Sequence, residues 1–175
     1  MPTIESSNTI AGSFGQRRVA GAPSNGTNEV QTITLAGPPT GGTFRLSFGG
    51  HVTAPISWSA TNATLATNVQ TALRALGNIG AAGVTIAVGT MTAGVGTLTA
   101  TFGGNLARLA ISTLTVAENA LTGTSPSVNI AKTTPGVTAT HRGAPTGALL
   151  TNTDTGVLYR NNGVSLAPVW LQLGS

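Results

Sequence analysis

The sequence predicts an α+β fold that is mostly β: a β-sandwich-like sheet module covered by one amphipathic helix. Three observations support this prediction. Apolar and polar residues alternate in short segments such as 43–48 and 97–102, as they do in strands with one buried face. The segment 62–76 instead repeats its apolar residues with a helical period. Turns rich in glycine and proline separate these segments, and 24 of the 175 residues are glycine.

Four parts follow one another along the predicted chain. They are an extended N-terminal arm over residues 1–28, a β-rich module over 29–136 with its helix near 62–76, a linker over 137–145, and a small C-terminal β-hairpin unit over 146–175. The arm shows neither a strand period nor a helical one. Its composition fits a free terminus, and it also fits an arm that orders on a partner as its spaced apolar residues fill pockets.

The module begins with predicted strands joined by turns. Val30–Leu35 is rich in threonine and β-branched residues, and the glycines and prolines of 37–42 follow it. Thr43–Phe48 alternates cleanly, and the alternation resumes over 52–58. Pro55 has no N–H to donate to a strand ladder, so we expect this last strand at the edge of a sheet.

One helix is predicted near residues 62–76. Its apolar stripe consists of Leu65, Val69, Ala72, Leu73 and Leu76. Thr61 or Asn62 can cap its start, Arg74 lies in the last turn, and Gly77 suits the position after its end. We expect this stripe to pack on a sheet.

Strand patterns return after the helix. Apolar residues alternate over 84–88 and 97–102, and further strands are predicted at Leu109–Val116 and Ser127–Ala131. Between the last two, Leu121–Pro126 contains the Gly, Ser and Pro residues of a turn.

The last thirty residues predict a hairpin. Residues 156–160 and 169–173 are the expected strands, with a turn at 161–163 and with Tyr159 and Trp170 as the large side chains. An isolated hairpin is only marginally stable in water. We therefore expect this unit to dock on the module, on copies of itself or on another protein.

Residues capable of acid–base chemistry are scarce. Only 7 % of the residues are charged, with four acids, two histidines and no cysteine. The absence of cysteine excludes a disulfide scaffold and thiolate metal sites. His51 and His141 are far apart in sequence, and there is no GxSxG motif or cluster of carboxylates. The sequence thus predicts no enzyme, no metal site and no cofactor.

The net charge of +4 is spread along the chain. Nucleic-acid-binding modules usually cluster Lys and Arg on one face, whereas only Arg17 and Arg18 are adjacent here. No stretch approaches the roughly 20 apolar residues of a membrane-spanning helix. We therefore expect neither direct nucleic-acid binding nor a membrane partner.

Residues 28–85 resemble a module of virion structural proteins from tailed phages, particularly phages of actinobacteria. The motifs that support the resemblance are NEVQTIT, PTGGTF, TAPI, ALRALGNIG and GVT, in this order. The similarity continues more loosely to about residue 137, and residues 147–174 look like the C-terminal endings of phage head and tail surface proteins. The module is present in one copy, whereas a long fibre is expected to have several.

The resemblance implies a non-enzymatic capsid decoration protein that binds the outer surface of the major capsid protein lattice and stabilises the head. The protein is then expected in the virion, after synthesis in the cytoplasm of the host bacterium, and as a homo-oligomer, with a trimer favoured by analogy. The expected capsid contacts are Ile4, Ile10, Phe14, Arg17 and Arg18, and the expected self-association or docking residues are Tyr159, Trp170, Leu171 and Leu173. The alternative is a head-fibre or tail module that binds a receptor or a host surface glycan.

Overall fold

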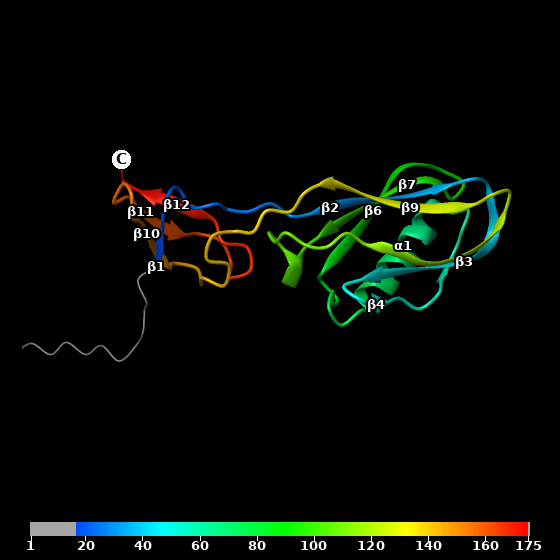
Figure 1. Cartoon of the computed structure of the whole chain (residues 1–175), viewed down its shortest axis with the longest axis horizontal. Helices are drawn as coiled ribbons and strands as arrows, with labels where there is room; N and C mark the ends of the chain where they lie inside the picture. Colours follow the sequence, from blue (N-terminus) through cyan, green and yellow to red (C-terminus); the bar gives the residue numbers. More distant parts are fainter. Residues whose placement is uncertain (1–16, 175) are drawn as a thin grey trace, which may run out of the picture.

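The computed structural model describes residues 17–174. In chain order its elements are β1 (Arg17–Val19), β2 (Val30–Ala36), β3 (Pro39–Phe48), β4 (His51–Val52), β5 (Ile56–Ser57), α1 (Asn62–Arg74), β6 (Val84–Thr92), β7 (Val95–Phe102), the 3-10 helix η1 (Gly104–Leu106), β8 (Thr115–Gly123), β9 (Ser127–Thr134), β10 (Leu149–Asn152), β11 (Leu158–Asn161) and β12 (Trp170–Leu173). They form two bodies at opposite ends of the long axis (Figure 1). We call β2–β9 with α1 the sandwich, and β1 with β10–β12 the end sheet.

The sandwich consists of two antiparallel sheets. One has the strand order β6-β7-β2-β9, and in the other β3 pairs with β8, β4 and β5. Burial alternates along β2 and along the second half of β3, as the sequence pattern predicts. The ring of Phe48 on β3 stacks on that of Phe102 on β7 at 5.6 Å between centroids, and this contact joins the two sheets. The predicted fold class, mostly β with one covering helix, is confirmed.

Helix α1 packs its predicted stripe into the sandwich core. Leu65, Val69 and Leu73 are fully buried, and Leu76 is nearly so just beyond the helix end. The N-cap residue is Thr61, which makes no side-chain capping hydrogen bond. Gly77 lies beyond the C-cap, which is Ala75.

Polar side chains of α1 bind the free edges of both sheets. On the β6 side, Gln70 Oε1 accepts a hydrogen bond from Ile86 N at 2.9 Å, and Arg74 Nε donates to Val84 O at 2.7 Å. On the other side, Asn68 Nδ2 donates to Ser57 O at 2.9 Å. The helix therefore closes the opening between the sheets and satisfies the edge strands that line it.

The chain between η1 and β8 departs from the prediction. The predicted strand Leu109–Val116 is wrong in its first part, because β8 begins at Thr115 and runs to Gly123. Residues 109–114 are instead held by the side chains of Glu29 and Gln31, which replace a strand ladder. The predicted turn Leu121–Pro126 is correspondingly shorter.

The end sheet has the order β1-β10-β11-β12. The predicted hairpin is present as the antiparallel pair β11–β12, and β1, which falls within the predicted arm, pairs in parallel with β10. The expected tight turn at 161–163 does not form, because Asn161 still belongs to β11 and pairs with Trp170, so that residues 162–169 make a longer loop. The side chain of Asn161 is fully buried. Asn161 Nδ2 donates to Ala144 O, and its Oδ1 accepts from Val169 N.

Two extended segments join the bodies and run side by side (Figure 1). They pair at Thr27 and Val137 through two backbone hydrogen bonds. Arg108 reinforces this junction, since its Nη1 donates to Asn25 O and Pro168 O. Arg142 donates from the end-sheet side to Ala107 O.

Candidate functional site

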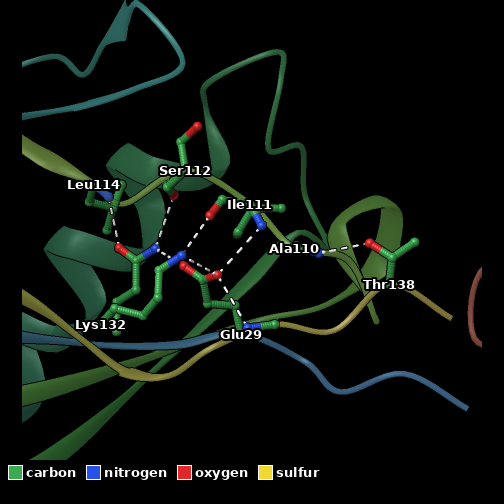
Figure 2. Close-up of polar contacts among 9 residues, drawn as sticks. Glu29, Ala110, Ile111, Ser112, Leu114, Lys132 and Thr138 are labelled. Atoms are coloured by element: carbon green, nitrogen blue, oxygen red, sulfur yellow. Dashed lines mark hydrogen bonds and ion pairs between the residues drawn. The ribbon is translucent and has the colours of Figure 1, made fainter. Parts of the chain in front are cut away.

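The carboxylate of Glu29 is fully buried in the sandwich. Lys132 Nζ lies 2.8 Å from Glu29 Oε2, and Figure 2 shows the two side chains meeting beneath residues 110–114. Lys132 also donates to Ile111 O, while Gln31 donates to Ser112 O and accepts from Leu114 N.

Hydrogen bonds outweigh burial in setting the pKa of the Glu29 carboxyl group. Burial alone raises the pKa of this carboxyl, but donation from Lys132, Gln31 and the N–H groups of Gly136 and Ile111 brings the pKa below its ordinary value of 4.5. The carboxylate is fully enclosed and both of its oxygens accept hydrogen bonds, so it offers nothing to a substrate. This cluster fixes the 110–114 segment to β2 and β9.

The remaining titratable groups in the described part of the chain do not converge. Among the residues that the structure describes, no group of three or more His, Cys, Asp or Glu side chains could hold a metal ion. His51 is exposed on β4, and His141 Nε2 lies 2.8 Å from Arg18 O. A cavity of about 410 Å³ lies between η1 and residues 164–167, and its lining contains no ionisable side chain.

The end sheet offers a different kind of site, a face composed mainly of leucines and arginines. Strand pairing places Arg18, Thr151, Leu158 and Leu173 opposite one another across all four strands. The neighbouring row places Leu149, Arg160 and Leu171 side by side. Paired residues share a face of a sheet. We call these seven residues the outer face.

The outer face is exposed, whereas the opposite face forms a small core. Leu149, Leu171 and Leu173 have 49 %, 45 % and 40 % of their surface exposed. On the opposite face, Leu150 and Trp170 are buried together with Ala144. Exposed leucines gathered on one face of a short sheet indicate an interaction surface.

Basic residues lie in both bodies. In the sandwich, Glu29 pairs with Lys132 and Glu118 pairs with Arg45 at 3.0 Å, whereas Arg74 and Arg108 donate to backbone oxygens. The end-sheet strands contain the basic residues Arg17, Arg18 and Arg160. Asp154, in the turn after β10, accepts a hydrogen bond from Gly21 N. The described part of each body therefore has more basic than acidic residues.

The structure places some of the predicted site residues together. Arg18, Leu171 and Leu173 lie on the outer face, whereas Arg17 and Tyr159 lie on the opposite face. Trp170 is 4 % exposed, and its indole N–H donates to Thr140 O, so this side chain supports the end sheet from within. The predicted arm contacts Ile4, Ile10 and Phe14 lie outside the described residues.

Sequence reasoning missed Leu149 and Arg160. Residues 149–152 read Leu-Leu-Thr-Asn and do not alternate between apolar and polar, so their exposed and buried positions are visible only in the structure. The place of Leu149 and Arg160 beside Leu171 depends on the strand register, which a sequence pattern does not show.

No protein-family model and no curated protein matches the sequence. A solved chain from Mycobacterium phage Patience has a similar structure, with a TM-score of 0.42 and 14 % sequence identity. The alignment covers 85 % of this chain and 56 % of that chain, so this chain spans little more than half of that length. Within residues 17–174, no helix combines the length and apolar character needed to cross a membrane.

Proposed function

We propose that this protein is a non-enzymatic structural protein of a tailed-phage virion, bound to the outer surface of the capsid lattice as a decoration protein. Its partner in this proposal is the major capsid protein. The observation that carries the proposal is the division of the molecule into a sandwich and an end sheet, the second of which has an exposed, leucine-rich face that includes Arg160. The sequence resemblance described above agrees with it.

In this arrangement the end sheet attaches and the sandwich projects from the particle. The N-terminal segment supports the same orientation, because it leads directly into β1 of the end sheet. The predicted arm contacts and the outer face therefore belong to the same end of the molecule.

The size of the outer face explains why an arm is needed as well. Four strands about 4.8 Å apart, each with about four residues rising 3.3 Å, cover roughly 200 Å². A stable interface buries about 800 Å² on each partner. In this proposal the sixteen residues before β1, which can span at most about 55 Å, supply the further contact area.

Electron cryo-microscopy of virions of the phage that encodes this chain tests the proposal. We expect density for the sandwich at regular positions over the head, with the end sheet toward the lattice. Density confined to sparse fibres or to the tail would overturn it and favour the receptor- or glycan-binding alternative. The trimer remains part of the proposal, and sedimentation velocity of the purified protein tests it.

A further inference from the structure

We propose that the outer face of the end sheet is the docking surface of this protein, and that its occupant is a protein surface with carboxylates beside an apolar ridge. This inference rests on the proposed function, in which that surface belongs to the capsid. It adds the residues that make the contact and the chemistry that they recognise.

The first argument is the asymmetry of the end sheet. Leu150 and Trp170 fill the core on the face toward Ala144, whereas Leu149 and Leu171 lie on the opposite face with nearly half of their surface exposed. These two leucines flank Arg160 in one row of the strand register. Covering this row removes apolar surface from water without any rearrangement of the sheet.

The second argument is charge. Arg160 separates the two leucines, and none of the seven residues of the outer face is an acid. Two copies joined through this face would bring arginines against arginines, which opposes self-association there. Arginine forms bidentate hydrogen bonds with carboxylates and is enriched at interfaces. The face therefore matches an acidic partner better than a second copy of this chain.

The test compares matched variants for binding to capsids that lack this protein, measured by co-sedimentation. Leu171→Asp and Arg160→Ala alter the outer face, and Val52→Asp and Arg45→Ala are the controls. Val52 is 48 % exposed on β4, and the Arg45 side chain is 41 % exposed on β3, so both controls make the same change on the sandwich. All variants are made in a Trp58→Phe background, in which an unchanged Trp170 emission spectrum establishes that each variant keeps the end sheet folded.

We expect each outer-face variant to weaken capsid binding at least tenfold, and each control to bind like the wild type. Binding of the wild type should also weaken as salt rises, since charges at a partly exposed interface are screened. If the outer-face variants bind as well as the controls, the inference is overturned while the proposed function stands. If they instead change only the sedimentation coefficient of the free protein, the face joins copies of this chain. If the wild type does not bind capsids at all, the proposed function fails as well.

Discussion

At the scale of single residues, buried polar side chains organise the segments that lack regular pairing. Gln31 of β2 and Glu29, which immediately precedes β2, supply acceptors and a donor to residues 111–114. Asn161 performs the same task in the end sheet, where it bonds to both the 144–145 segment and the loop after β11. In both places, side chains form the hydrogen bonds to the backbone that a neighbouring strand would otherwise form.

Replacing Glu29 by Gln is expected to lower the free energy of unfolding by about 2–3 kcal/mol. Breaking a buried ion pair by removing one partner commonly costs about 3–5 kcal/mol, and the partial exposure of Lys132 reduces that cost. Urea unfolding measures the change. Glu118→Gln, in the exposed pair with Arg45, is the control and should cost less than about 1 kcal/mol. If the two substitutions lowered the free energy of unfolding equally, the prediction that burial makes the Glu29 ion pair the more stabilising one would be contradicted.

The same carboxylate predicts a pH dependence. Because its folded pKa lies below 4.5, the stability that it provides is complete above that value. As pH falls, the unfolded chain takes up the proton first, and the stabilisation is lost as the pH passes through the folded pKa. The difference in unfolding free energy between wild type and Glu29→Gln should therefore shrink between pH 6 and pH 3. A difference that stays constant with pH would show that the charge of Glu29 is irrelevant.

At the scale of elements, α1 is more than an apolar cover. Its leucines and valine fill the core, but its flanks also bond to the strand edges beside it. Asn62 extends this pattern at the start of the helix, since it donates to Met91 O and accepts from Gly94 N. The helix thus protects β6 from pairing with another chain.

Removal of one such contact should destabilise the sandwich measurably. Gln70→Ala leaves Ile86 N without its acceptor, and an unsatisfied, partly buried donor costs about 1–2 kcal/mol. Thermal unfolding followed by far-UV circular dichroism measures the effect. Thr71→Ala, at the next and exposed helix position, is the control and should change the stability little.

The sequence allowed α1 and most of the sandwich strands to be predicted, because their patterns are local. It did not allow β1 to be predicted, since three residues have no clear period and their partner lies far along the chain. The misplaced start of β8 has a similar cause: Ile111 and Leu114 resemble strand residues, but the side chains of Glu29 and Gln31 bind their backbone. Of the outer face, Arg18, Leu171 and Leu173 were predicted as contact residues, and only the register unites them with Leu149 and Arg160.

At the scale of the whole molecule, the junction determines how firmly the two bodies are held. Arg108 anchors it from the sandwich side, and Trp170 N donates to Asn25 Oδ1 from the end-sheet side. The two tryptophans lie one in each body, Trp58 in the sandwich and Trp170 in the end sheet. Each body can therefore be followed separately.

Arg108→Ala is expected to loosen the end sheet while the sandwich stays intact. In a Trp58→Phe background, the Trp170 fluorescence midpoint in urea should fall, because two charge-assisted hydrogen bonds worth about 2 kcal/mol together are lost. The helical circular dichroism signal of α1 should keep its midpoint. Arg160→Ala, an exposed end-sheet control, should move neither signal. A joint shift of both midpoints would mean that the bodies unfold as one unit.

The end sheet draws its strands from both sides of the sandwich in the sequence, and this dictates an order of events during synthesis. The ribosome completes the sandwich at Thr134 before it reaches β10. The partner strand of β1, which is β10, is therefore synthesised about 130 residues after β1. Once the sandwich has folded and paired Thr27 with Val137, the loop that must close to bring β1 and β10 together contains only about twenty residues. Closing this loop costs about 1–2 kcal/mol less conformational entropy than closing one of about 130 residues. A copy whose translation stops short of Leu173 would have a finished sandwich and an incomplete end sheet. Under the proposed function, such a truncated copy would be left off the particle, so assembly itself would select complete chains.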